Sequence, residues 1–313
     1  MILRVRKSAG RLTTALHADD GMSVEVHFRR FASSLELTNE ETRKAATIQN
    51  QIREVLEARQ DISRAELSGS YDRKTKIRPL HDIDILVVFD PSVAYDGRGT
   101  MIKPRQFLSE IGKSVPALRK KIPRVGNSRF QDRSLNIAVD GIGFDLVPAF
   151  ELQRGGYFIP NRKQQEWIPT NPLKFAERLT ALNQSDYFGE WLVPFIKMVK
   201  SWAKQSAPEL KSYLIEVLIL KCMHGIESYS DACGTFFFLV SKEILGSVVD
   251  PMTGREVNEL VPLQRMGLMR KLRRNLSLTL DAQVAEKLGR SSQVSAKFFS
   301  QIFGPKFPLT IKA

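Results

Sequence analysis

Cysteine is scarce in this sequence, and its scarcity excludes two kinds of stabilised fold. Only Cys222 and Cys233 occur among 313 residues, and they do not form a C-x-x-C pair. A disulfide framework needs several cysteines, and a structural zinc site needs Cys or His ligands at set spacings. Neither is indicated. His17, His27 and His224 are scattered along the chain without the spacing of metal ligands. The chain therefore suits a reducing compartment.

Long apolar runs are also lacking. The nearest approach to a membrane-spanning segment, WLVPFIKMV, is interrupted by Pro194 and Lys197. The N-terminal segment MILRVRKSAGRLTTALHADD has no apolar stretch of the secretory kind and no acidic residue before Asp19. Its composition is compatible with a mitochondrial presequence. We favour a basic strand or arm on a cytoplasmic protein that has no contact with a membrane.

Acidic residues are outnumbered by basic ones. The chain has 34 Asp and Glu against 47 Lys and Arg, which gives a formal net charge of +13. Basic residues cluster in RKTKIR (73–78), LRKKIPR (118–124) and RKLRR (270–274). Such a surface suits an anionic partner, either nucleotides, nucleic acid or an acidic membrane surface. Scattered lysines that only keep the protein soluble are the alternative.

The remaining composition is that of a globular protein. Hydrophobic residues make up 42% and aromatic residues 9%, which excludes a disordered chain. The length of 313 residues allows one large domain or two ordinary ones. The pattern of elements changes near residue 160. We expect a first domain over residues 1–160 that carries the strands, and a helical second domain over residues 161–313.

Each half has its own pattern of elements. In the first half we predict helices over 39–59 and 104–118, strands over 65–67 and 82–89, and a hairpin over 134–150 that turns at residues 140–143. The segment GGYFIPNRKQQEWIPTNP is rich in Gly, Pro and Asn and is predicted to be a loop. In the second half we predict helices over 172–182, 191–204, 212–226 and 230–244, and further helices that start at residues 262 and 291.

Two carboxylates at the start of an apolar strand indicate a metal site. In the stretch LSGSYDRKTKIRPLHDIDILVVFD, Asp82 and Asp84 stand two residues apart, so both side chains lie on one face of the strand. Two negative charges this close repel each other, and a cation between them offsets the repulsion. A hard divalent cation, Mg²⁺ or Mn²⁺, is the usual partner of such carboxylates.

A third carboxylate lies in the predicted hairpin. Asp145 stands between Phe144 and Leu146 in an apolar arm, where an unpaired charge is costly to bury. If this arm pairs beside the strand of Asp82 and Asp84, three acidic groups meet on adjacent strands. Such an arrangement predicts a two-metal site.

The Gly69-Ser70 pair upstream indicates a place for phosphate. We expect its backbone N–H groups, at the start of a helix, to hold a triphosphate, with a further bond from the Ser70 hydroxyl. Glycine suits this position because a Cβ atom would block the close approach of phosphate to the backbone.

The ordered set of Gly69-Ser70, Asp82-x-Asp84 and Asp145 resembles the signature of the polymerase-β-like nucleotidyltransferase superfamily. The resemblance implies that Asp82 and Asp84 hold a metal on the β- and γ-phosphates. Together with Asp145 they would hold a second metal that lowers the pKa of an attacking ribose hydroxyl. In-line attack on the α-phosphorus would then expel pyrophosphate.

Further segments resemble the CD-NTases, which are bacterial cyclic-oligonucleotide synthases related to animal cyclic GMP-AMP synthase and oligoadenylate synthetase. The matching segments are GSYDRKTKIRPLHDIDILVVF, FDLVPAF, WIPTNP, VKSWAK and KSYLIE, in the family's order over residues 65–220. FFSQIFGPKF (298–307) resembles the close of one bacterial branch. The resemblance implies an α+β fold. A polymerase-β-like core with a mixed sheet would carry a long N-terminal spine helix and be followed by a C-terminal helical domain.

The same resemblance implies roles for three residues of the second half. Lys200 would contact the phosphates of the bound nucleotide, and Ser212 and Tyr213 would meet the triphosphate and stack on a base. Lys197 and Lys204 share a helix face with Lys200 and could take its role. A solvated helix face for Lys200 and a core position for Tyr213 are the alternatives.

The resemblance implies an enzyme that joins ATP and other NTPs into a cyclic di- or trinucleotide second messenger. It would act in bacterial antiphage (CBASS) signalling, with a regulatory protein or a nucleic acid as activator and a separately encoded effector that senses the product. The chain lacks the Cys/His insertion of animal cyclic GMP-AMP synthase, so activation by double-stranded DNA is not implied. Two alternatives stay open. One is a nucleotidyltransferase that tails RNA or tRNA or modifies a protein, and the other is a catalytically silent nucleic-acid-binding scaffold. The three carboxylates argue against the scaffold.

Overall fold

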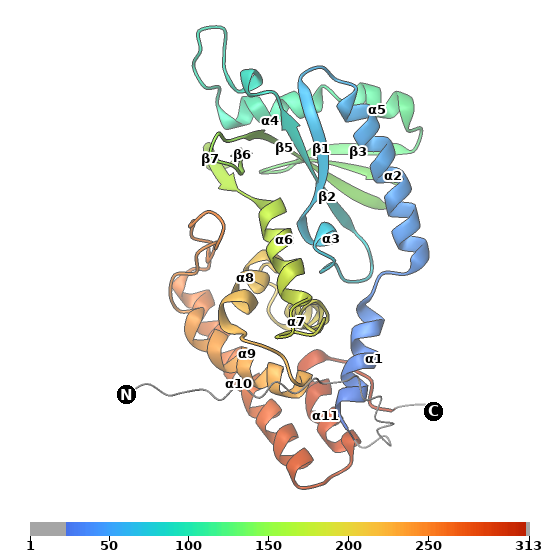
Figure 1. The fold of residues 1–313 in the computed structure, drawn as a ribbon, viewed down its shortest axis with the longest axis vertical. Coiled ribbons are helices and arrows are strands. Elements are labelled where there is room, and N and C mark those ends of the chain that lie inside the picture. The colour runs from blue at the N-terminus through green and yellow to red at the C-terminus, as the bar shows by residue number, and fades with distance from the viewer. Residues whose placement is uncertain (1–22, 311–313) are drawn as a thin grey trace.

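A seven-stranded mixed sheet forms the centre of the first half of the molecule (Figure 1). The computed structural model describes residues 23–310, so the predicted N-terminal arm lies outside the described residues. The strands are β1 (Ile62–Ser68), β2 (Asp82–Phe89), β3 (Val125–Phe130), β4 (Leu135–Val139), β5 (Ile142–Glu151), β6 (Tyr157–Asn161) and β7 (Glu166–Thr170). They are ordered β1-β2-β5-β4-β3, with β6 paired to β5 and β7 to β6. Only β2 and β5 are parallel among these pairs, which confirms the predicted α+β class with a mixed sheet.

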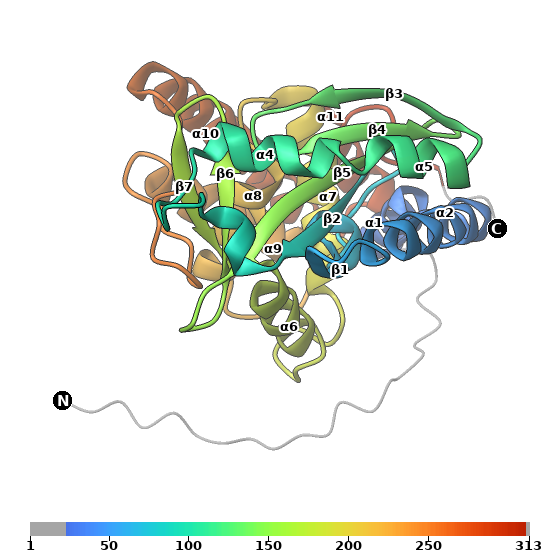
Figure 2. The ribbon, with the colours of Figure 1, turned by 90° about the horizontal axis from the view of Figure 1, so that it is seen from above.

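Helices pack on one face of the sheet, where the strand side chains are apolar. Residues 85–89 of β2 are all buried, as expected for a central strand. The covering helices are α2 (Asn39–Glu57), α4 (Pro104–Gly112) and α5 (Val115–Lys121), and their apolar side chains share one core with β1, β2, β4 and β5. Seen from above, α4 and α5 lie across the sheet (Figure 2). The short helices α3 (Gly69–Asp72) and η1 (Pro91–Ala94) follow β1 and β2.

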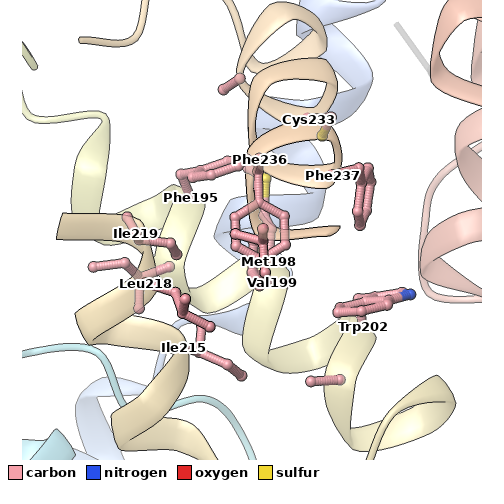
Figure 3. Close-up of a cluster of buried hydrophobic side chains, with 14 of the residues drawn as sticks. Phe195, Met198, Val199, Trp202, Ile215, Leu218, Ile219, Cys233, Phe236 and Phe237 are labelled. Carbon is pink, nitrogen blue, oxygen red and sulfur yellow. The ribbon is translucent and has the colours of Figure 1, made fainter. Parts of the chain in front are cut away.

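The second half is a helical body with its own core. It contains α6 (Pro172–Asn183), α7 (Leu192–Ser206), α8 (Ser212–Cys222), α9 (Tyr229–Glu243), α10 (Pro262–Lys287) and α11 (Ser292–Phe303). Large side chains from different helices meet in this core, among them Phe195 and Trp202 of α7 and Phe236 of α9 (Figure 3). No helix within residues 23–310 is both long enough and apolar enough to cross a membrane.

One helix was not predicted. The helix α1 (Glu25–Leu35) precedes the spine helix α2, and its side chains Phe28, Phe31 and Leu35 are buried in the core of the helical body. No element was predicted there, because Arg29 and Arg30 interrupt the short apolar stripe. The predicted boundary at residue 160 stays a prediction. The sheet continues to Thr170 in β7, and α1 packs with helices that lie far away in the sequence.

Two segments differ from their predicted structure. The segment predicted as a loop contains the hairpin β6–β7, because Tyr157, Ile159 and Ile168 are buried in a small apolar cluster on the sheet. Pro169 is tolerated because β7 is an edge strand, where a missing N–H costs no central hydrogen bond. Pro160 lies in the part of β6 beyond its pairing with β5, which ends at Phe158. The predicted helix over 104–118 is divided into α4 and α5. Pro116, which cannot donate an intrahelical hydrogen bond, lies in the first turn of α5.

Candidate active site

The three predicted carboxylates lie on the parallel pair β2 and β5. In the register of this pair Asp84 is opposite Asp145, and Asp82 is opposite Gly143. Paired residues of neighbouring strands lie about 4.8 Å apart and point to the same face. The structure therefore brings the strand positions of all three carboxylates together on one face of the sheet, as the sequence predicts.

Burial and mutual repulsion act on two of these carboxylates. Burial, and next the charge of Asp145, raises the pKa of Asp84 to about 6. Burial also raises the pKa of Asp145, although the hydrogen bond from Asn136 works in the opposite direction. The charge of Asp82 adds to the rise at both positions. A proton or a cation is therefore favoured between them.

Two amide side chains that sequence reasoning missed hold Asp145 in place. The Nδ2 atom of Asn136 donates to Oδ1 of Asp145 at 2.8 Å, and Nε2 of Gln131 donates to the same oxygen at 3.1 Å. Asn136 is the register partner of Asp145 in the β4–β5 hairpin. Counting outward from the observed two-residue turn, Asp140-Gly141, places Asn136 there, whereas the predicted turn over residues 140–143 would have placed Ala138 opposite Asp145.

Gly69 is required by the carboxylate of Asp84. Its φ of +69° lies in the left-handed region, which favours glycine. An added Cβ atom would also lie 1.8 Å from Oδ2 and 2.9 Å from Cβ of Asp84. The structure thus gives a second reason for glycine at this position, contact with a carboxylate, beside the predicted close approach of a phosphate. Gly143 has a similar role, because a Cβ atom there would lie 2.6 Å from Oδ1 of Asp82.

A cavity of about 310 Å³ opens beside Asp82, between the sheet and the helical body. The lining residues come from both halves of the chain. The polar and charged ones are Ser70, Thr75, Lys76, His81, Asp82, Lys200, Lys204, Lys211 and Ser212. The volume is at the lower end of the range for small-molecule sites. Four lysines make the cavity suitable for an anion.

Lys200 lies in the wall of this cavity but is itself buried. Its Nζ atom donates to Oγ1 of Thr75 at 2.8 Å, to the Thr75 carbonyl oxygen at 3.2 Å, and to the Glu216 carboxylate. Burial lowers the pKa of Lys200, while the charge of Glu216 opposes that change. The alternative of a solvated helix face does not describe Lys200.

The other predicted residues of the second half are placed differently. Ser212 is exposed and lines the cavity. Tyr213 is not among the lining residues, since its ring lies 5.0 Å from that of Phe175 at the edge of the helical core. Burial and then Asp250 raise the pKa of Tyr213. The buried Lys197 pairs with the half-exposed Glu36 and is likewise absent from the cavity, whereas Lys204 lines it.

The donor set suits a hard divalent cation, because it consists of carboxylate oxygens that repel one another. Across residues 23–310, however, no three His, Cys, Asp or Glu side chains are gathered closely enough to hold a metal ion as they lie. Asp145 in particular accepts the two amide hydrogen bonds from Asn136 and Gln131. The structure therefore brings the strand positions of the carboxylates together, without a metal-binding arrangement of their side chains.

Comparison with known proteins identifies relatives of this chain. The family model described as the Second Messenger Oligonucleotide or Dinucleotide Synthetase domain (SMODS) matches residues 22–183. A cyclic AMP-AMP-AMP synthase from Acinetobacter is 24% identical over 222 residues, which cover 66% of this chain and 61% of that protein. One from Escherichia coli is 26% identical over 228 residues, with 66% of each chain covered. The match to the Acinetobacter protein thus spans less than two thirds of its length.

Solved structures share the fold. E. coli CdnC determined with ATP superposes with a TM-score of 0.70 at 20% identity, covering 91% of this chain and 98% of that chain. The cyclic AMP-GMP synthase DncV of Vibrio cholerae superposes with a TM-score of 0.69 at 13% identity, covering 93% and 99%. At these identities the likeness concerns the arrangement of helices and strands.

The contact between Gly69 and Asp84 gives a test with a matched control. Gly69→Ala should lower the free energy of unfolding by about 2–4 kcal/mol, because it combines a strained φ with a collision. Gly141→Ala has a comparable φ of +81° and nothing within 4 Å of the added atom. It should cost only about 1–2 kcal/mol. Urea denaturation of both variants measures the difference. Equal losses would show that Asp84 does not constrain position 69.

The raised pKa of Asp84 predicts a pH dependence of stability without divalent metal. Its folded pKa of about 6 lies above the unfolded value. The protonated carboxyl therefore favours the fold at low pH, and this contribution is lost as the pH rises through about 6. Asp84→Asn should melt about 2–5 °C higher than wild type at pH 7.5, and near wild type at about pH 4. Melting in EDTA across this range is the measurement. A difference that is independent of pH would contradict the raised pKa of Asp84.

Proposed function

The chain belongs to the SMODS family of second messenger oligonucleotide or dinucleotide synthetases, and from this premise we propose that it joins nucleoside triphosphates, ATP among them, into a cyclic di- or trinucleotide. The observation that carries the proposal is the register of β2 and β5, which aligns Asp84 with Asp145 next to a lysine-lined cavity. The curated relatives include cyclic AMP-AMP-AMP synthases.

The triphosphate would lie in the cavity between the sheet and the helical body. Ser70 and Ser212 line it from opposite sides and offer hydroxyl donors. Lys76, Lys204 and Lys211 offer cationic donors that reach it from three different segments, and Lys200 adds positive charge from the wall. Asp82 lies in the same cavity, so the carboxylates would lie at the phosphate end of the nucleotide.

The carboxylates would hold the divalent metal that the family's chemistry implies. Asp82, Asp84 and Asp145 are the proposed ligands, with Mg²⁺ or Mn²⁺ as the ion, because their oxygens are hard and their repulsion favours a cation. When bound, such ions polarise phosphate oxygens and promote ionisation of the attacking hydroxyl. Asn136 and Gln131 would orient Asp145 through their hydrogen bonds to Oδ1.

Base recognition is the proposed role of Tyr213. Its ring is half-buried and contacts both Phe175 and Arg73, whose guanidinium lies 5.7 Å from the ring centroid. An aromatic face of this kind stacks on any base. Because Tyr213 directly follows the cavity-lining Ser212, a modest movement of the start of α8 would bring the ring to the nucleotide.

The proposed biological setting is supported by the relatives, and the site itself does not indicate it. E. coli CdnC has been solved in complex with a HORMA protein. A regulatory protein, or alternatively a nucleic acid, is therefore the proposed activator of this chain. We propose that the product acts as a second messenger in antiphage (CBASS) signalling in the bacterial cytoplasm, where a separately encoded effector would sense it.

Incubation of the protein with the four NTPs and Mg²⁺ or Mn²⁺ tests this function. Mass analysis after phosphatase treatment should show a phosphatase-resistant cyclic di- or trinucleotide. Asp82→Asn combined with Asp84→Asn should lower product formation by at least about a thousandfold, since it removes two of the three proposed metal ligands. Asp90→Asn, which changes an exposed acid directly after the same strand, should leave the yield unchanged.

Two results would contradict the proposal. A linear or polymer-attached product would indicate a tailing or protein-modifying enzyme, to which the basic surface is also suited. Full activity of the double variant would mean that the carboxylates on β2 do not take part.

A further inference from the structure

A buried cluster of four residues joins the two halves of the molecule behind the cavity. Glu216 of α8 accepts from Nε of Arg73 at 2.7 Å and from Oγ1 of Thr75 at 2.6 Å, and it pairs with Lys200 of α7. Arg73 and Thr75 belong to the loop that follows Gly69. The cluster therefore connects the loop of the sheet domain to two helices of the helical body.

The charges of this cluster depend on one another. The side chains of Arg73, Lys200 and Glu216 are 6%, 5% and 0% exposed, so water screens none of them well. Burial opposes ionisation of Glu216, but the charges of Lys200 and Arg73 outweigh it and keep its pKa low. Two buried cations thus share one buried anion. Removing one member of such a group leaves an uncompensated charge.

Lys200 has no hydrogen-bond donor left for a ligand in this arrangement. An ammonium group has three N–H donors, and those of Lys200 go to the Thr75 hydroxyl, the Thr75 carbonyl and Glu216. In contrast, Lys76, Lys204 and Lys211 line the cavity, and no ion pair to them is formed within residues 23–310. Direct donors to an anion would come from these three lysines.

The cluster also fixes the position of Ser70. The backbone N–H of Thr75 donates to the carbonyl oxygen of Ser70 at 2.9 Å, and the Thr75 hydroxyl lies 3.4 Å from the same oxygen. Glu216, Thr75 and Ser70 therefore form a continuous chain of contacts from α8 to the cavity wall. A change at Glu216 is transmitted to the loop through Thr75.

We propose that Glu216 is a positioning residue for the nucleotide cavity. It holds Arg73, Thr75 and Lys200 so that the Ser70 loop and helix α7 face each other. This inference rests on the proposed function, because it assumes that the cavity binds a nucleoside triphosphate. Lys200 then acts on the phosphates through its charge and through Thr75, and the direct contacts are left to Lys76, Lys204 and Lys211.

The direction in which one substitution changes the affinity for nucleotide distinguishes positioning from simple electrostatics. Glu216→Gln removes a negative charge close to an anion site, which by itself would tighten the binding of a triphosphate. If Glu216 positions the loop, affinity should instead fall about tenfold, the scale on which residues in one ion-pair network are coupled. The measurement is calorimetric titration with a non-hydrolysable ATP analogue and Mg²⁺.

A double-mutant cycle shows whether Glu216 acts through Lys200. The effect of Glu216→Gln on affinity should shrink in a Lys200→Met background, because both changes break the same cluster. Lys204→Met is the matched control, since Lys204 lies one turn further along α7, lines the cavity and is outside the cluster. The effects of Glu216→Gln and Lys204→Met should therefore add.

A second variant keeps the test open if Glu216→Gln does not fold. Thr75→Val leaves every charge in place and removes only the hydroxyl that contacts Glu216, Lys200 and Ser70. It should also weaken binding, and this effect should likewise shrink in the Lys200→Met background. Unchanged or tighter binding in these variants, or effects that add with Lys200→Met as they do with Lys204→Met, would overturn the inference. Absence of binding to the wild type would instead overturn the proposed function.

Discussion

Repulsion between carboxylates held in fixed register on β2 and β5 is the constraint on which the rest of the site depends. The parallel pairing places Asp84 opposite Asp145, and burial raises the pKa of both groups. The sheet accepts this arrangement because glycines at positions 69 and 143 leave the carboxylates room where a side chain would collide with them. Like charges gathered in this way favour a cation, and the cation in turn favours an anionic ligand such as a triphosphate.

The helical body supplies the second wall of the cavity. The cavity next to Asp82 is closed by α7 and α8, whose lysines supply positive charge opposite the carboxylates. A buried cluster around Glu216 keeps these helices in register with the loop that follows Gly69. Gly69, just before this loop, lies against Asp84, and the loop lines the cavity, so the proposed metal-binding and phosphate-binding parts of the site share one structural support.

The sequence predicted those parts of the fold and site that depend on local patterns. The bounds of β2 follow from its apolar run, and the hairpin β4–β5 follows from its glycine turn. The helix α1 and the hairpin β6–β7 were missed because basic residues and prolines obscured their short apolar patterns. Asn136 could have been found by counting register only from a turn at Asp140-Gly141, which is shorter than the predicted turn. The ion pair of Arg73 and Glu216 could not have been found from the sequence, because the two residues are 143 positions apart and nothing local to either one indicates the other.

Binding of Mn²⁺ in the presence of a non-hydrolysable ATP analogue tests the central claim most directly, because it observes the cation without depending on turnover. Paramagnetic resonance can follow the loss of free Mn²⁺ on titration with wild type, Asp84→Asn and Asp90→Asn. Asp90 directly follows β2 and is exposed, so its variant should bind like the wild type. Asp84→Asn should weaken binding at least about tenfold, because it removes a charged ligand. Equal binding by all three proteins would contradict the claim that these carboxylates are held together for a metal ion.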